Sequence, residues 1–437
     1  MGSGTLHSEE LAAKLLELAQ RSQVDAAEVL QSRSHSRPVF FEANRLKELQ
    51  SSESEGTALR LWRNSRPGIA VAYGSVDPQT LVDRALSLSE LNDPETIEMS
   101  EGKPISYADD GEAVSVEQML TWGTDAIARV REVYPDVLCS VDCDCELEST
   151  RLINTLGLDS THKDTSLYCA MSVDWVRGDD FLTASDGQTQ RSHLDPVEIA
   201  NRIIQRLDWA KENVEPCTGR VPILFTSKAA DMLWGTFYGA LNSKRVIEGS
   251  SPWSEHRGQQ VIHEAITISQ EPDIGPFSCP FDDEGTPTQR LVFIQNGVLQ
   301  HFYCDRTTGR RLGQQTTGNG FRPSLGSYPT PGLFNLLIQP GDRSFMDLIG
   351  DLEDGIIVDQ ILGGGAGISG DFSVNVDLGY RVKKGQVVGR IKDTMVAGNV
   401  YTALKQAIEL GNDAEWNGSC YTPSLIVEGL SVTGRAK

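Results

Sequence analysis

Three glycines near residue 365 have the spacing of a loop that binds a phosphate group. Gly365, Gly367 and Gly370 form the pattern G-x-G-x-x-G after the apolar segment 355–362. A dinucleotide site needs a helix directly after such glycines, because the N-terminus of that helix holds the pyrophosphate. Residues 372–379 instead alternate apolar and polar side chains, and this period of two predicts a strand. We therefore expect the glycines to serve a turn or a close approach between two backbones rather than a nucleotide.

Three clustered cysteines raise the question of a metal site. Cys139, Cys143 and Cys145 occupy positions of one parity in the segment 138–148, and polar or acidic side chains occupy the other parity. Such alternation is typical of a strand whose thiols face the core, since a free cysteine behaves as a small hydrophobic residue. No second pair of ligands follows at the spacing of a zinc site. We interpret the segment as a structural strand.

A histidine followed by a glutamate is the first half of one zinc-protease motif. His263 and Glu264 provide it, but no second histidine follows at the spacing that H-E-x-x-H requires. The neighbouring apolar residues predict a strand instead of the helix on which that motif depends. A nonstandard site built from His256, His263 and Cys279 is the alternative that the sequence leaves open.

The composition excludes several classes of protein. The chain has 437 residues, with 61 acidic and 39 basic side chains and a net charge of -22. Such a surface repels phosphate backbones and anionic lipids, so we expect neither a nucleic acid nor a membrane as a partner. No segment has the apolar length that crosses a bilayer, and residues 1–20 lack the basic start and apolar block of a secretory signal. Because eight cysteines in a chain of this size fit reduced thiols, we expect a cytoplasmic protein.

Polar boundaries divide the chain into three expected units. The first, residues 1–95, combines two helices with a run of short strands. Residues 91–114 are acidic and interrupted by proline and glycine, which predicts a linker. The second unit, 115–215, places a meander of strands between two helices, and the third, 219–437, begins with a helix and continues mostly as strands. The predicted fold class is α+β, with two mixed α/β N-terminal units followed by a β-rich, barrel-like C-terminal domain.

Two local signals refine the third unit. Asn296 and Gly297 lie between two apolar segments, and this dipeptide accepts positive φ at both central positions of a hairpin turn. Residues 398–411 have the composition of a helix that ends at Gly411. We therefore predict a hairpin around residue 296 and a helix near the C-terminus.

Three segments of the chain closely resemble the TldD/PmbA family, once called modulators of DNA gyrase. They are the stretch "FDDEGTPTQRLVFIQNGVLQHFYCDRTTGRRLGQQTTGN" at 281–319, the stretch that begins "GISGDFSVNVDLGYRV" at 367–404, and the terminal "TPSLIVEGLSVTG" at 422–434. The N-terminal order of helix, strands and helix is also similar to this family. The resemblance thus covers nearly the whole chain and implies a metallopeptidase family.

The resemblance further implies that two branches of the family pair as a heterodimeric metallopeptidase. The metal-binding branch carries His-Glu-x-x-x-His on the helix that opens the C-terminal domain, together with a late cysteine ligand. In this chain Trp234, Gly235 and Gly239 stand at the three motif positions, and Cys420 lies near that of the late cysteine. None of the first three can ligate zinc or move a proton. The chain therefore resembles the TldE/PmbA branch, and we expect zinc only in a TldD-like partner subunit.

The resemblance also implies a substrate class, which is unfolded or leader peptides threaded in extended form. An exposed strand edge beside a glycine-rich loop suits such peptides, because its free N–H and C=O groups accept an added strand. We expect Gly318, Asn319, Ser369, Gly370 and Asp371 to line that cavity, unless they serve only as turn residues. The sequence is also compatible with a homodimer in isolation, with a stand-alone metallopeptidase that uses nonstandard ligands, and with a regulatory peptide-binding protein.

Overall fold

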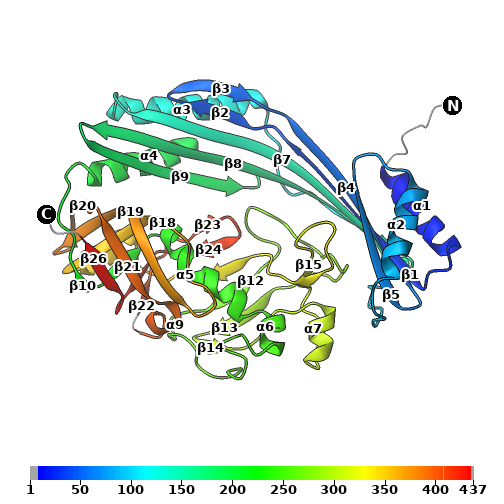
Figure 1. Ribbon diagram of the computed structural model, residues 1–437. Helices are drawn as coiled ribbons and strands as arrows, with labels where there is room; N and C mark the ends of the chain where they lie inside the picture. Colours follow the sequence, from blue (N-terminus) through cyan, green and yellow to red (C-terminus); the bar gives the residue numbers. More distant parts are fainter. Residues whose placement is uncertain (1–7, 407, 435–437) are drawn as a thin grey trace.

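The computed structural model describes residues 8–406 and 408–434. A long curved sheet arches over the C-terminal half of the chain, and the first two helices lie at one end of this sheet (Figure 1). Below the arch, a second sheet curls into a half-barrel, and a third sheet lies beside it (Figure 1). The fold is therefore α+β as predicted, and the barrel-like expectation is met by a half-barrel.

The arching sheet contains nine strands, and it joins segments from both sides of the expected linker. Six of its strands lie in the order β3-β2-β7-β1-β4-β5. Strand β8 also pairs with β7, and β6 and β9 pair with β8. The strands are β1 Ala26–Ser36, β2 Val39–Glu42, β3 Arg45–Leu49, β4 Ser52–Arg63, β5 Arg66–Tyr73, β6 Pro104–Tyr107, β7 Leu138–Asn154, β8 Asp159–Arg177 and β9 Asp180–Gln190. The expected linker 91–114 therefore contributes one strand, because residues 104–107 pair in parallel with β8.

The strand prediction for the three cysteines is confirmed. Cys139, Cys143 and Cys145 are buried on one face of β7, which packs against helices α3 Val116–Val133 and α4 Pro196–Trp209. At the other end of the sheet, helices α1 Ser8–Arg21 and α2 Pro78–Ser89 cover a smaller core. The start of α2 follows from its sequence, since the Asp77 carboxylate accepts a hydrogen bond from the Thr80 N–H and Pro78 occupies the first turn.

The half-barrel has strand order β10-β26-β21-β19-β18-β11-β25-β22, with β20 beside β19. Its strands are β10 Gly219–Arg220, β11 Ile223–Phe225, β18 Asp354–Leu362, β19 Asp371–Lys383, β20 Gln386–Arg390, β21 Thr394–Asn399, β22 Ile408–Leu410, β25 Leu425–Val427 and β26 Ser431–Gly434. One face packs with α4 through residues such as Ile357 and Leu378, and the other packs on helix α5 Ser227–Ala240 through Ile356 and Val358. The half-barrel thus connects the arching sheet to the core around α5.

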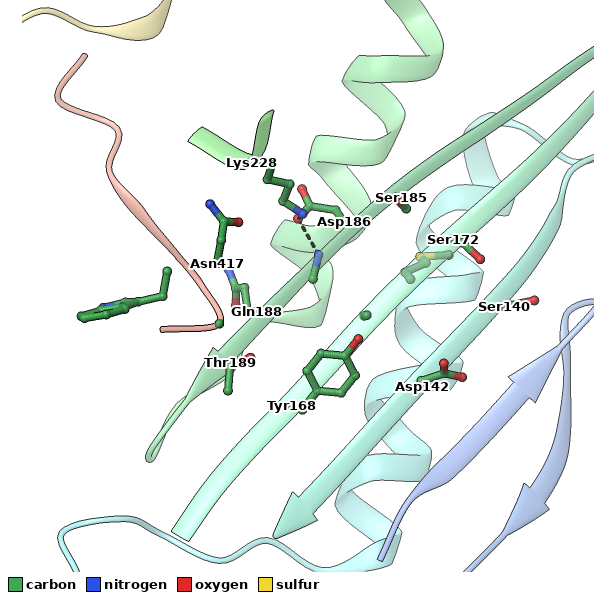
Figure 2. A pocket seen from close by; sticks show the side chains of 15 residues that line it. Ser140, Asp142, Tyr168, Ser172, Ser185, Asp186, Gln188, Thr189, Lys228 and Asn417 are labelled. Carbon is green, nitrogen blue, oxygen red and sulfur yellow. Dashed lines mark hydrogen bonds and ion pairs between the residues drawn. The ribbon is translucent and has the colours of Figure 1, made fainter. Parts of the chain in front are cut away.

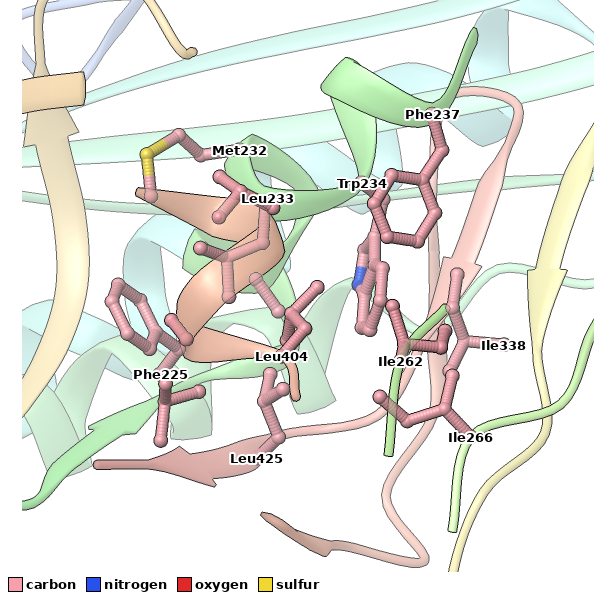
Figure 3. Packing of buried hydrophobic residues seen from close by; sticks show 14 of the residues in the cluster. Phe225, Met232, Leu233, Trp234, Phe237, Ile262, Ile266, Ile338, Leu404 and Leu425 are labelled. Atoms are coloured by element: carbon pink, nitrogen blue, oxygen red, sulfur yellow. The ribbon is translucent and has the colours of Figure 1, made fainter. Parts of the chain in front are cut away.

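The third sheet closes the other side of that core. Its order is β14-β13-β12-β17-β24-β23. These strands are β12 Ile268–Gln270, β13 Leu291–Gln295, β14 Val298–Leu299, β17 Leu336–Ile338, β23 Glu415–Asn417 and β24 Cys420–Thr422. A two-stranded ribbon (β15 Gly320–Phe321, β16 Thr330–Pro331) and short helices complete the chain, namely α6 Ser243–Ile247, α7 Arg306–Arg311, α8 Phe345–Asp351 and α9 Val400–Ala403. Aromatic and aliphatic side chains from α5 and both neighbouring sheets meet in one cluster (Figure 3).

The local predictions for this half have mixed outcomes. The hairpin is confirmed, with φ of 48° at Asn296 and 77° at Gly297 between β13 and β14. The helix predicted over 398–411 is wrong beyond the short α9, because residues 408–410 pair with β25 instead. The strand predicted around His263 is also wrong, since residues 264–265 form a turn and β12 begins only at Ile268.

None of the helices described in the structure combines the length and the apolar character needed to cross a membrane.

Candidate functional site

Helix α5 carries Trp234, Gly235 and Gly239, the three residues that we expect at the motif positions of the metal-binding branch. The Thr226 hydroxyl accepts a hydrogen bond from the Ala229 N–H and caps the start of the helix. Two faces of α5 have different surroundings. The side chains of Leu233, Trp234 and Phe237 are completely buried, whereas Gly235 is exposed. The three motif positions therefore do not share one environment.

Trp234 belongs to the core (Figure 3). Its indole N–H donates a hydrogen bond of 2.7 Å to the Thr422 hydroxyl, and its ring meets that of Phe237 edge to face at 5.7 Å. A buried indole needs such an acceptor, because an unsatisfied N–H inside the protein is costly. The side chain at the first motif position thus packs between the helix and the third sheet.

Gly235 and Gly239 leave part of the surface of α5 without side chains, and the glycine-rich loop 363–370 lies next to Gly239. A Cβ atom at Gly235 would have no heavy atom within 4 Å, whereas one at Gly239 would lie 3.3 Å from Ile368. The Thr236 hydroxyl donates to the Ala366 carbonyl at 3.3 Å. Of the three glycines in the G-x-G-x-x-G pattern, Gly365 lies against Met232 of α5 and Gly370 has a positive φ, and strand β19 follows instead of a helix.

Three polar side chains meet beside the core: Asp231 and Tyr238 lie on α5, and Cys420 lies on the neighbouring strand β24. Burial raises the pKa of the Asp231 carboxyl, although its hydrogen bond with the Cys420 thiol opposes that shift. Burial and the nearby Asp231 raise the pKa of the Cys420 thiol well above its ordinary value, so the thiol is protonated at neutral pH. Burial and Cys420 raise the pKa of Tyr238 to about 12.

This set does not make a zinc site, because it provides only two side chains of the kinds that bind zinc, Asp231 and Cys420, whereas zinc sites in proteins use three or four. Over the part of the chain that the structure describes, no three His, Cys, Asp or Glu side chains are grouped so as to hold a metal. The nonstandard site of His256, His263 and Cys279 is therefore not formed. Instead, His263 Nδ1 accepts a hydrogen bond from the Ala265 N–H, and the Cys279 thiol donates to the Phe281 carbonyl.

A cavity of about 360 Å³ lies next to the first turn of α5 (Figure 2). Strands β7, β8 and β9 form one wall, and the turn between β23 and β24 forms another. The lining is mostly polar and includes Asp142, Tyr168, Gln188, Lys228 and Asn417. In Figure 2 the Lys228 ammonium group points toward Asp186 on β9. The cavity thus lies between the edge of the arching sheet and helix α5.

Asp186 is the centre of a buried ion cluster beside this cavity. Its carboxylate contacts Lys228, Arg202 at 2.9 Å and Arg206 at 2.6 Å. Arg206 also pairs with Asp359 of the half-barrel at 2.6 Å. Burial alone would raise the pKa of Asp186, but the Arg206, Lys228 and Arg202 cations outweigh it and lower that pKa to about 2. The cluster fixes the arching sheet, α4 and α5 to one another.

Sequence reasoning missed Lys228 and Asp186 as members of a site. One signal was present, because Asp186 shares its parity on β9 with the buried Leu182 and Ala184. A carboxylate at a core-facing position needs a cationic partner. That partner lies on α5, which only the three-dimensional arrangement reveals.

The five residues proposed for the cavity lining lie in two separate places, and none of them lines the cavity of Figure 2. The Asn319 amide is completely buried and donates to Gln270 at 2.6 Å and to the Gly332 carbonyl at 2.8 Å. Gly318 beside it has φ of 71°. The Asn399 amide donates to the Ser369 carbonyl and to Asp371. Gly370, between them, has φ of 82°. Their role in a cavity shared with a partner subunit stays a prediction.

Comparisons with known proteins agree with the resemblance seen in the sequence. Residues 218–434 match the model of the PmbA/TldA metallopeptidase C-terminal domain, and residues 27–89 match the model of domain 1 of the same proteins. An uncharacterized protein of Methanocaldococcus jannaschii is 27% identical over 95% of this chain and 98% of its own length. The metalloprotease PmbA of Escherichia coli O157:H7 is 26% identical, over 55% of this chain and 50% of its own.

A solved structure shares the fold. The crystal structure of TldE from Thermococcus kodakarensis superposes with a TM-score of 0.88, covering 97% of this chain and all of that one at 24% identity. At 24% identity the superposition shows that the two proteins share a fold. The matched family models cover part of the arching sheet and the C-terminal half of this chain. The chain is a member of the PmbA/TldD metallopeptidase family.

Proposed function

We propose that this chain is the non-catalytic, TldE/PmbA-like subunit of a heterodimeric zinc metallopeptidase that cleaves unfolded or leader peptides. The observation that carries the proposal is the identity of residues 234, 235 and 239 on α5. A buried tryptophan and two glycines occupy the positions at which the catalytic branch has its histidines and glutamate. A TldD-like partner in the cytoplasm would supply the zinc and the general base.

The chain's own contribution to such an enzyme is to hold a peptide. Among the described strands, β9 pairs only with β8, so its other edge is free of a neighbouring strand. Gln360 covers part of this edge, accepting from the Ser185 N–H and donating to the Thr183 carbonyl. Farther along, Gly187 and Thr189 line the cavity beside Lys228. An extended peptide can add to this edge with its backbone, which gives affinity with little demand on side-chain sequence.

Co-expression with a TldD-like protein from the same genome tests the proposal. We expect the two chains to copurify, and we expect peptide hydrolysis to appear only when both are present. A partner variant whose motif glutamate is replaced by alanine is the matched control, and it should copurify without activity. Hydrolysis by the isolated chain would favour a stand-alone peptidase. Failure to pair, combined with peptide binding, would favour a regulatory peptide-binding protein.

A further inference from the structure

A second, smaller cavity of about 190 Å³ lies under the arching sheet, away from α5. Its sheet wall consists of two cross-strand pairs of β7 and β8, namely Glu148 opposite Asp164 and Thr150 opposite His162. Its other wall comes from the segment 277–283 and from the C-terminal half. The volume is below the roughly 300 Å³ at which sites for drug-sized ligands begin. It therefore suits a ligand the size of one side chain.

The lining combines aromatic rings with carboxylates. Four phenylalanines face the cavity, namely Phe277, Phe281, Phe321 and Phe334. Aromatic faces attract cations electrostatically, and the attraction is stronger where water is excluded. The carboxylates of Glu148, Asp164 and Asp283 also line it, and none of the described lining residues is a lysine or arginine. The cavity thus has a surplus of negative charge.

The nearest arginines balance the charge of Asp164 and Asp283 but not that of Glu148. Arg191 lies 3.0 Å from Asp164, which also accepts the Ser278 N–H. Arg322 pairs with Glu28 at 2.6 Å, as Arg60 does at 2.9 Å, and its charge also acts on Asp283, which accepts its backbone N–H. Glu148 has no ion pair with any residue that the structure describes. Although Glu148 is exposed, the protein packed around its carboxyl group raises its pKa, and the neighbouring Glu146 and Asp164 raise it further, as is typical of a carboxylate without a cationic neighbour.

His162 adds an unused hydrogen-bonding group. Its side chain is only 9% exposed, and its Nε2 has no hydrogen-bond partner within the described part of the chain. Burial lowers the pKa of this imidazole, so the ring is neutral at pH 7. One of its two nitrogens can then accept a hydrogen bond from a ligand. A buried polar atom without a partner is costly unless a ligand or water satisfies it.

The cavity shares the lining residue Glu148 with a wider one. Glu148 is exposed, and it also lines a cavity of about 840 Å³ that extends over strands β1, β4 and β7. A flexible aliphatic chain can therefore enter beside Glu148 and place its end between the phenylalanines and the carboxylates. We propose that the pocket formed by Glu148, His162, Asp164 and the four phenylalanines binds an alkylammonium group, either of a lysine side chain or of a free aliphatic diamine.

Isothermal titration calorimetry on the full chain, without a partner subunit, tests this site independently of the proposed role in a peptidase. The ligands are Nα-acetyl-lysine N-methylamide, 1,5-diaminopentane and the uncharged Nα-acetyl-norleucine N-methylamide. We expect an alkylammonium ligand to bind, more weakly at higher salt, and the norleucine compound not to bind. Tighter binding of the lysine compound would assign the site to a peptide side chain, and tighter binding of the diamine would assign it to a free amine.

The decisive variant is Glu148→Gln, because Glu148 is exposed and its replacement is not expected to impair folding. It should weaken alkylammonium binding about tenfold or more, as expected for loss of one charged contact. Glu146→Gln, two residues earlier on β7 and outside the pocket lining, is the matched control; because the charge of Glu146 raises the pKa of Glu148, this variant should bind the alkylammonium ligands no more weakly than the unmodified chain does. Absence of binding at millimolar ligand, equal binding of the norleucine compound, or equal effects of the two variants would overturn the proposal.

Discussion

Replacing Trp234 by alanine measures directly whether the first motif position is part of the core. An aromatic side chain of this kind buries roughly 150–250 Å², which at about 25 cal/mol per Å² corresponds to about 4–6 kcal/mol. Trp234 is completely buried, and alanine keeps only its Cβ atom. We therefore expect Trp234→Ala to lower the free energy of unfolding by about 3–5 kcal/mol. Urea unfolding followed by circular dichroism, together with zinc analysis of each variant, provides the measurement.

The hydrogen bond from the indole to Thr422 gives the prediction a second, independent part. Thr422→Val leaves a buried N–H without an acceptor and should cost about 1–3 kcal/mol. Trp234→Phe removes the donor, so the double variant should lose less stability than the sum of the two single variants. A loss below about 1 kcal/mol for Trp234→Ala would refute the core assignment. So would strictly additive losses for Trp234→Phe and Thr422→Val.

Three further predictions concern the glycines of α5, the turn at Gly318 and the buried ion cluster around Asp186. Gly235→Ala should raise the free energy of unfolding by about 0.5–1 kcal/mol, because a Cβ atom there meets nothing within 4 Å. Gly239→Ala should raise it less, because the new Cβ atom would lie 3.3 Å from Ile368. The midpoints of urea unfolding of the two variants check this order. Gly318→Ala should cost at least about 1 kcal/mol, since φ is +71° and the new Cβ would lie 2.5 Å from a backbone oxygen; unaltered stability would remove the turn role. Asp186→Asn should cost about 3–5 kcal/mol by leaving cations unpaired. Because its pKa falls from 3.8 to about 2 on folding, ionisation of Asp186 contributes about 2 kcal/mol above pH 4, and this contribution is lost as the pH drops through 2; the variant should show a flatter pH dependence of its urea midpoint.

Local sequence signals predicted those elements whose structure depends on neighbouring residues. The parity of Cys139, Cys143 and Cys145 identified β7, and the Asn296-Gly297 dipeptide identified the hairpin. The helix predicted over 398–411 failed because residues 408–410 pair with β25, which lies later in the chain. Propensity cannot report such a pairing, since tertiary contacts override it.

The candidate site also has a part that the sequence predicted and a part that only the structure reveals. The helix with Trp234, Gly235 and Gly239 was located from the sequence, and its boundaries follow from the Thr226 cap. The contact of Lys228 with Asp186 could not be predicted, because it joins α5 to β9 through the packing of two sheets. The pocket under the arching sheet also depends on residues of β7, β8 and the segment 277–283, which no local pattern connects.

The most direct test of the subunit assignment is to inactivate the TldD-like half of the purified heterodimer. Replacing the motif glutamate of the TldD-like partner by alanine should abolish peptide hydrolysis, while the complex still holds one zinc ion, on the partner. Peptide hydrolysis that survives this change, or a second zinc ion bound by this chain, would contradict the account.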